Sequence, residues 1–204
     1  RRAARLLEAG KLVAFPTETV YGLGADASNP EAVAAIFAAK GRPSNHPVIV
    51  HVARGADLSR WVSRLPVEAI KLATAFWPGP LTMILPRAAH VPAAVAGGQD
   101  SIGLRCPSHP VARTLLAEFR GGQGGIAAPS ANRFGHVSPT TAQHVIDEFG
   151  QPGEGPLAAV LDGGQSDVGI ESTIIDLTRL DTPGPVLLRP GQISAAQILS
   201  LIHI

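Results

Sequence analysis

Two short polar segments, about ninety residues apart, carry the residue types that a polyphosphate needs. In the first, Lys40 and Arg42 flank a glycine. In the second, Ser130 and Asn132 follow a proline, and Ser138 lies shortly after them. Lysine supplies a point charge and arginine a planar fork of N–H donors, and both suit phosphate oxygens. If the fold brings the two segments together, they form a nucleotide site.

Each segment also has a simpler structural interpretation. Lys40 and Arg42 lie where a helix is expected to end, and cations there complement the helix dipole. Ser138 precedes a proline and would make a good helix N-cap. Dipole complementation explains one cation more easily than two cations separated by a glycine, with His46 close behind. We therefore favour phosphate binding.

Further polar side chains follow or lie within expected strands, and open α/β sheets bind ligands at strand ends. These residues are Thr17, Thr19, His51, Arg105 and Ser172. His51 alternates with apolar residues, so we expect it to face a cleft, and Arg105 is a candidate clamp for a carboxylate. The alternatives are a tight turn for the threonines, a structural histidine and a surface arginine.

The motifs indicate neither a covalent nucleophile nor a metal site built by the protein. Ser130 does not lie in a Gly-x-Ser-x-Gly motif, and no Gly-Lys-Ser/Thr sequence indicates a P-loop. No His-Glu-x-x-His arrangement is present, and the single Cys106 excludes an internal disulfide. We therefore expect any metal to arrive as Mg²⁺ bound to the nucleotide, with no metal ligands from protein side chains.

The composition is typical of a well-buried globular protein. A chain of 204 residues is long enough for one domain with a sizeable core. Its residues are 45% hydrophobic and 16% charged. A net charge of +1 provides no strong attraction to nucleic acid or a membrane, and no apolar run approaches the roughly 20 residues of a membrane span. With its one cysteine, the chain is predicted to be cytoplasmic and not to bind a membrane.

Helices and strands are expected to alternate along the chain. The expected helices are residues 1–9, 29–39, 67–76, 108–118 and 139–149. The expected strands are residues 12–15, 48–52, 81–85, 102–105, 126–129, 160–162, 173–177 and 186–188. This alternation predicts an α/β domain with a mixed sheet. We assign the domain to residues 1–198, because residues 199–204 match one reading frame of a common transposase sequencing adapter; the alternative is an ordinary helix end. The natural protein is then expected to continue past Ile198.

The polar segments described above resemble those of the YrdC/TsaC family of threonylcarbamoyl-adenylate synthases. The matching segments are Lys40/Arg42, Ser130/Asn132 and residues 16–22, 77–82, 169–173 and 188–191. The resemblance covers residues 1–198 in order and implies a twisted mixed sheet, flanked by helices, with a deep basic cleft. It implies a nucleotidyltransferase that converts L-threonine, bicarbonate and ATP, with Mg²⁺, to threonylcarbamoyl-AMP and pyrophosphate. Other proteins would then use the product to modify an adenosine of tRNA.

The resemblance also implies residue roles. Lys40 and Arg42 are the expected catalytic, phosphate-binding residues, and Arg105 is expected to take the threonine carboxylate. The expected ATP-binding set is Lys40, Arg42, His46, Ser101, Ala128, Ser130, Asn132, Ser138 and Arg189. The expected threonine-binding set is Thr17, Thr19, His51, Arg105 and Ser172. His46 departs from the asparagine that the family often has, and the motifs resemble the long, two-domain members although no second domain follows.

Three alternative functions remain open. The first is the related module of HypF-type carbamoyltransferases, which makes carbamoyl-adenylate. The second is a non-catalytic module that binds tRNA or double-stranded RNA, although a net charge of +1 and 4% aromatic residues argue against strong RNA binding. The third is a regulatory nucleotide-binding domain.

Overall fold

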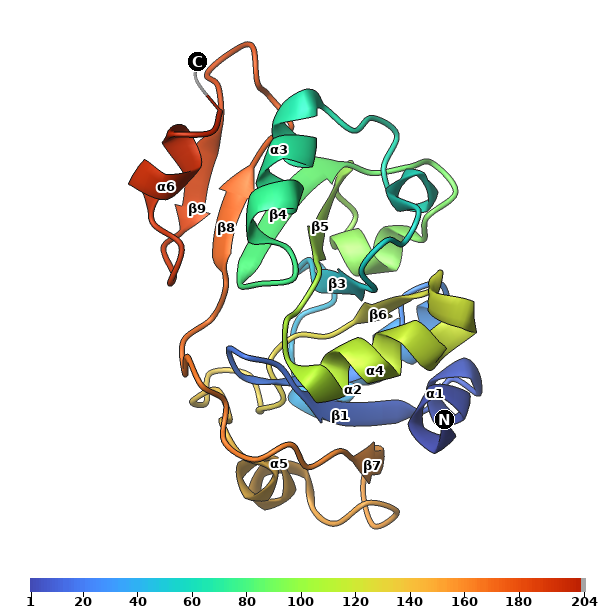
Figure 1. The fold of residues 1–204 in the computed structure, drawn as a ribbon. Helices are drawn as coiled ribbons and strands as arrows, with labels where there is room; N and C mark the ends of the chain where they lie inside the picture. Colours follow the sequence, from blue (N-terminus) through green and yellow to red (C-terminus); the bar gives the residue numbers. More distant parts are fainter. Residues whose placement is uncertain (203–204) are drawn as a thin grey trace.

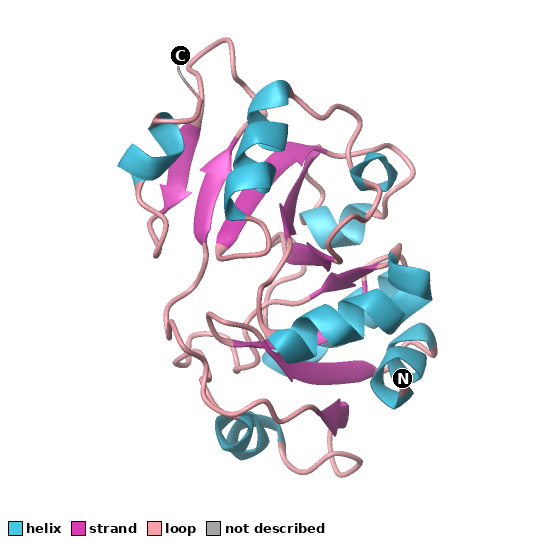
Figure 2. Ribbon diagram, viewed as in Figure 1, coloured by secondary structure: helices cyan, strands magenta, loops and turns pink. Residues whose placement is uncertain are grey.

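The computed structural model describes residues 1–202, which form one mixed sheet of nine strands with helices packed against it (Figures 1 and 2). The strands are β1 (Leu12–Pro16), β2 (Tyr21–Asp26), β3 (Ile49–Val52), β4 (Leu81–Pro86), β5 (Ser101–Arg105), β6 (Gly125–Ala127), β7 (Leu157–Val160), β8 (Thr173–Asp176) and β9 (Val186–Arg189). The α-helices are α1 (Arg2–Glu8), α2 (Pro30–Lys40), α3 (Val67–Phe76), α4 (Pro110–Glu118), α5 (Ala142–Phe149) and α6 (Ala195–Leu199), and three short 3₁₀ helices are Leu58–Arg60, Ala93–Ala96 and Phe119–Gly122.

The sheet has the strand order β7-β1-β2-β6-β3-β5-β4-β8-β9. The pairs β1–β7, β3–β5 and β4–β8 are parallel, and the other neighbouring pairs are antiparallel. In Figure 1 the strands at the β9 end stand upright whereas β1 lies across the view, so the sheet is twisted. The predicted fold class, an α/β domain with a twisted mixed sheet, is confirmed.

Strand β1 is buried on both of its faces. Val13 and Phe15 pack in one cluster with α1 and α4, whereas Leu12 and Ala14 pack in the other cluster, which contains the buried face of α2. Successive side chains of a strand point to opposite faces. A short, continuously apolar strand is therefore the sequence signature of a strand covered on both sides.

Helix α2, predicted over residues 29–39, spans Pro30–Lys40. The Asn29 side chain accepts hydrogen bonds from the N–H groups of Glu31 and Ala32, and a proline occupies the first helical position. Gly41 closes the helix with a φ of 64°, a left-handed conformation that favours glycine. The sharp stop makes Lys40 the last helical residue and places Arg42 at the start of the following loop.

The strands β3, β5 and β4 are packed into the core on one face only. Val50, Leu104 and Met83 belong to the core, while the alternate residues His51 and Arg105 line a cavity on the other face. The strand predicted at residues 48–52 thus carries its histidine toward a cleft, as expected from the alternation with apolar residues.

Three parts of the fold differ from the sequence expectations. No strand was predicted between residues 16 and 47, but Tyr21–Asp26 form β2. The glycines there lower strand propensity, yet Gly24 is required because a Cβ would lie 2.8 Å from the Phe15 ring. Strand β7 ends where a strand over residues 160–162 was predicted to begin. Helix α6 was not predicted, although Ser194 and Gln197 form a capping box at its start.

The C-terminal residues are described only in part. Residues 203–204, which belong to the tail assigned to residues 199–204, lie outside the described residues. Leu199 ends α6, and Ile202 is buried in the core. No helix within residues 1–202 combines the length and the apolar character that crossing a membrane requires.

Candidate functional site

The two polar segments meet in space through Lys40. Its Nζ donates hydrogen bonds to the backbone carbonyls of Ser130 and Asn132, the latter at 2.5 Å. The Phe134 N–H donates to the Lys40 carbonyl at 2.8 Å, and the Phe134 ring contacts the His46 ring edge-on, with centroids 5.7 Å apart. The end of α2 and the loop after β6 are thus joined by both backbone and side-chain contacts.

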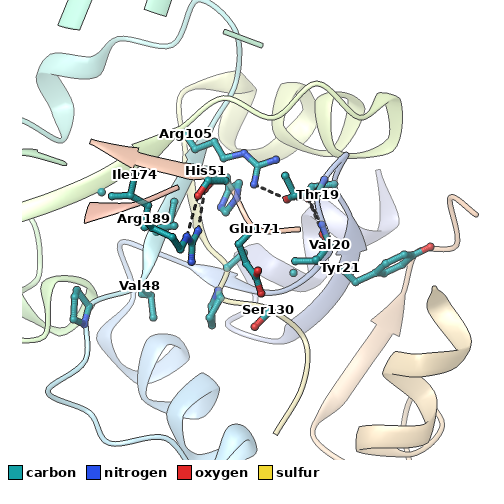
Figure 3. A pocket seen from close by; sticks show the side chains of 18 of the residues that line it. Thr19, Val20, Tyr21, Val48, His51, Arg105, Ser130, Glu171, Ile174 and Arg189 are labelled. Atoms are coloured by element: carbon teal, nitrogen blue, oxygen red, sulfur yellow. Dashed lines mark hydrogen bonds between the residues drawn. The ribbon is translucent and has the colours of Figure 1, made fainter. Parts of the chain in front are cut away.

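A cavity of about 320 Å³ lies beside this junction, over the open face of β3 and β5 (Figure 3). Nine of the predicted site residues line it: Thr17, Thr19, Arg42, His51, Arg105, Ala128, Ser130, Ser172 and Arg189. The other five, Lys40, His46, Ser101, Asn132 and Ser138, lie outside its lining. Most of the residues predicted from separate segments therefore converge on one cavity.

The floor of the cavity is formed by His51 and Arg105. These two residues are direct neighbours in the parallel pairing of β3 with β5, and both are almost fully buried. Arg105 Nη1 donates a hydrogen bond of 2.9 Å to Thr19 Oγ1 (Figure 3), and the Thr19 hydroxyl lies 2.9 Å from that of Thr17. Three of the predicted threonine-binding residues, Thr17, Thr19 and Arg105, are thus linked by hydrogen bonds.

Arg105 is held in place by a buried ion pair with Glu18. Glu18 accepts a hydrogen bond from Arg105 Nη2 and also accepts from the Ser108 N–H at 2.6 Å and the Ser108 hydroxyl at 2.5 Å. Burial lowers the pKa of Arg105, and the opposite charge of Glu18 acts against that effect. Because Glu18 occupies one edge of the guanidinium, a bound carboxylate would have to use its remaining donors.

Two buried nitrogen atoms at the floor have no hydrogen-bond partner within residues 1–202. They are Arg105 Nε and His51 Nδ1. Burial, followed by the charge of Arg105, lowers the pKa of His51 to about 3, so the imidazole is neutral at pH 7. Buried polar atoms normally have partners, and two such atoms beside a cavity indicate a site for a polar ligand.

Arg189 and Ser172 line another part of the cavity. Arg189 Nε donates to the Ser172 carbonyl at 2.9 Å, and Nη2 donates to the Ser172 hydroxyl at 3.2 Å. That hydroxyl also lies 2.7 Å from the Thr82 hydroxyl. The expected ATP-binding arginine and the expected threonine-binding serine are therefore linked directly.

Arg42 also lines the cavity, from the loop that follows α2. Its Nη2 donates to the Pro47 carbonyl at 2.8 Å, and its guanidinium lies over the Phe37 ring, 6.0 Å from the ring centroid. Its Nε is buried without a partner among the described residues, and burial lowers its pKa. The side chain is oriented by the protein while one donor is left for a ligand.

The five predicted residues outside the lining have other contacts. Lys40 is buried and uses two of its three donors on backbone carbonyls; burial and the charge of Arg42 lower its pKa to about 8. Asn132 Nδ2 donates to two carbonyls of its own loop, and Ser138 donates to Glu171 at 2.5 Å. Ser101 begins β5. Nucleotide binding by these residues and by His46 stays a prediction.

Three residues of the site were not predicted: Glu18, Tyr21 and Glu171. Glu18 anchors Arg105, Glu171 lines the cavity, and the Tyr21 hydroxyl donates to the Gly164 carbonyl at 2.7 Å. Each stands directly beside a predicted residue or within a matching motif. That position was the available signal, but the partners of Glu18 and Tyr21 lie about ninety or more residues away.

Residues 1–202 contain no group of three or more His, Cys, Asp and Glu side chains placed to hold a metal ion. Glu171 is the single acid among the described residues that line the cavity. This donor set does not form a metal site by itself, but it offers one carboxylate to a cation that arrives with phosphates. Mg²⁺ as a companion of ATP stays a prediction.

Comparison with known proteins gives consistent relatives. The Sua5/YciO/YrdC family model, described as telomere recombination, matches residues 5–191. The threonylcarbamoyl-AMP synthase of Pyrococcus abyssi is 46% identical over 202 residues, which cover 99% of this chain and 56% of the relative. That of Bacillus subtilis is 44% identical over 202 residues, covering 98% of this chain and 56% of the relative. The chain thus spans a little more than half the length of these relatives.

The solved structures agree with the sequence relatives. The crystal structure of Pyrococcus abyssi Sua5 complexed with L-threonine superposes with a TM-score of 0.90 and 46% identity, covering 99% of this chain and 56% of that one. HypF of T. kodakarensis has a TM-score of 0.73 at 19% identity, a likeness that shows the fold alone. Sequence motifs, fold and relatives lead to one assignment: the chain belongs to the Sua5/YciO/YrdC family.

Proposed function

We propose that this chain converts L-threonine, bicarbonate and ATP to threonylcarbamoyl-AMP, pyrophosphate and water. The observation that carries the proposal is a single cavity with two kinds of lining. A buried floor of His51, Arg105 and Thr19 carries polar groups suited to an amino acid, and a wall with Arg42 and Arg189 suits a polyphosphate. Relatives that are 44% and 46% identical, named threonylcarbamoyl-AMP synthases, support it.

Threonine is proposed to bind at the floor. Arg105 Nε and the remaining N–H donors of its guanidinium meet the carboxylate, while Glu18 binds Nη2. The neutral His51 offers a ring nitrogen to a polar group of the amino acid without adding charge. Thr17, Thr19 and Ser172 supply hydroxyls for its polar groups. The crystal structure of the Pyrococcus abyssi relative with L-threonine supports this choice of substrate.

ATP is proposed to bind along the wall, with its phosphates between Arg42, Arg189 and the Ser130 hydroxyl. Mg²⁺ enters with ATP and neutralises part of the phosphate charge. During adenylation, negative charge grows on the pyrophosphate that leaves. Fixed cations near that group stabilise the transition state because their orientation is set before the reaction. The contacts of Arg42 with Pro47 and Phe37 provide that orientation.

The reaction requires two bonds to form in one place. The threonine amine bonds to the carbon derived from bicarbonate, which yields a carbamate and releases water. A carbamate oxygen then bonds to the α-phosphorus of ATP as the bond to pyrophosphate breaks. A carbamate decomposes readily in water, so a cavity that holds both substrates increases the fraction that reacts. The product is a reactive acyl-adenylate, and we propose that a tRNA-modifying transferase consumes it.

The proposal is tested by incubating the chain with ATP, Mg²⁺, bicarbonate and isotopically labelled L-threonine. We expect pyrophosphate release that depends on threonine, together with labelled threonylcarbamoyl-AMP. Arg42→Ala should reduce both signals, whereas Arg2→Ala, which removes an exposed arginine on α1, should leave them unchanged. Pyrophosphate release that is independent of threonine would contradict the proposal.

A further inference from the structure

Glu171 is placed at the centre of the proposed ATP and threonine site. It is the single acid among the described lining residues, and Figure 3 shows its side chain between Arg189 and Ser130. It belongs to the segment that leads from β7 to β8. The backbone of this segment is fastened to the threonine-rich loop, because Val168 N–H donates to the Glu18 carbonyl at 2.9 Å and Gly169 N–H donates to the Thr19 carbonyl at 3.1 Å.

Glu171 carries a negative charge at neutral pH. Burial by itself would raise its pKa, but the hydrogen bond from Ser138 and the charge of Arg189 lower the pKa below its ordinary value. The Ser138 hydroxyl donates to Oε1 at 2.5 Å. The backbone N–H of Glu171 itself also lowers this pKa. Within residues 1–202, no other residue forms a hydrogen bond or an ion pair with Oε2, so this oxygen can accept a ligand.

A fixed carboxylate at this position conflicts with the binding of ATP alone. The phosphates of ATP carry several negative charges, and the wall that they are proposed to occupy includes Ser130 and Arg189 on either side of Glu171. Like charges within a few ångströms repel strongly in a partly buried site. The conflict disappears if a divalent cation lies between the carboxylate and the phosphates.

We propose that Glu171 is the protein ligand of the Mg²⁺ ion that ATP carries into the cavity. This inference rests on the proposed function. Mg²⁺ accepts oxygen ligands only and is commonly held by one or two carboxylates together with substrate phosphates and water. Glu171 supplies the one carboxylate available at the cavity, and Ser138 orients it, as a hydrogen-bonded neighbour orients a metal-binding carboxylate.

The test is calorimetric binding of the α,β-methylene analogue of ATP, which keeps the phosphates but cannot release pyrophosphate. Binding is measured with Mg²⁺ and with EDTA for the wild-type chain, Glu171→Gln and Asp167→Asn. Asp167 is the matched control, because it is an exposed acid four residues away in the same segment. We expect Glu171→Gln to reduce the enhancement of binding by Mg²⁺ by about tenfold or more and to bind the metal-free analogue at least as tightly as wild type. Asp167→Asn should behave like wild type.

Three other results would overturn the inference. If Glu171→Gln keeps the wild-type enhancement by Mg²⁺, Glu171 is not the metal ligand, and the proposed function stands. If Glu171→Gln instead weakens the binding of threonine measured without nucleotide and leaves the effect of Mg²⁺ intact, the carboxylate binds the threonine ammonium. If the wild-type chain binds no nucleotide with or without Mg²⁺, the proposed function fails together with the inference.

Discussion

Acidification should destabilise this protein through His51. The imidazole is buried on the cavity floor between the Phe15 ring, 6.1 Å away between centroids, and the Arg105 guanidinium. Burial opposes a positive charge on the imidazole, and the positive charge of Arg105 adds to this effect. The folded pKa is about 3, whereas an unfolded histidine has its ordinary pKa of 6.5. Between these values the unfolded chain binds a proton that the folded chain does not, so the free energy of unfolding falls as the pH falls.

The size of this effect follows from the two pKa values. One pKa unit corresponds to about 1.4 kcal/mol. At pH 5, about 1.5 pH units below the unfolded pKa, the loss relative to pH 7 is about 2 kcal/mol, and below pH 3 it approaches about 5 kcal/mol. A domain of this size typically has 5–15 kcal/mol of stability in total. The expected loss at pH 5 is therefore large enough to measure.

The measurement is urea unfolding at pH 7 and pH 5 for wild type, His51→Asn and His90→Asn. Other titrating groups contribute equally to all three proteins, so the comparison isolates the replaced histidine. We expect His51→Asn to be less stable at pH 7 but to lose about 2 kcal/mol less than wild type between the two pH values. His90 is exposed, and its variant should keep the wild-type loss. An unchanged loss in His51→Asn would refute the reasoning.

Two further substitutions test the contacts around the cavity. Glu18→Gln keeps the side-chain shape but leaves the buried charge of Arg105 unbalanced, so we expect the free energy of unfolding in urea to fall by about 3 kcal/mol or more. We also expect the KM for threonine to rise more than the KM for ATP. Equal rises in the two KM values would count against the anchoring role. Lys40→Met removes the donor to the carbonyls of Ser130 and Asn132, so we expect the free energy of unfolding to fall by about 1–3 kcal/mol and product formation to stop. Wild-type stability in this variant would show that these hydrogen bonds contribute little.

The parts of the fold with strong local signals could be predicted from the sequence. Asn29 and Gly41 specify both ends of α2 by their own backbone geometry. The alternation around His51 predicts which face of β3 it occupies, because side chains of a strand alternate. In both cases the deciding interaction lies within a few residues.

The parts that depend on distant partners could not be predicted in this way. Gly24 weakens the strand signal of β2, and its reason becomes visible only when Phe15 packs over it. Glu18 looks like a loop acid until Arg105, 87 residues away, pairs with it. Lys40 was expected to bind phosphate directly, and the pattern of residues gave no indication that its ammonium also ties two loops together.

In the proposed function, one cavity holds two separable subsites, one for threonine and one for the nucleotide. The most direct test measures binding of L-threonine and of the α,β-methylene analogue of ATP to wild type, Arg105→Gln and Arg42→Ala. We expect Arg105→Gln to weaken threonine binding by about tenfold or more, equivalent to about 1.4 kcal/mol, and to leave nucleotide binding unchanged. We expect Arg42→Ala to weaken nucleotide binding and to leave threonine binding unchanged, and melting temperatures are measured to check that both variants are folded. Two separable subsites would be contradicted if either variant weakened the binding of both ligands equally, or if neither variant weakened the binding of either ligand.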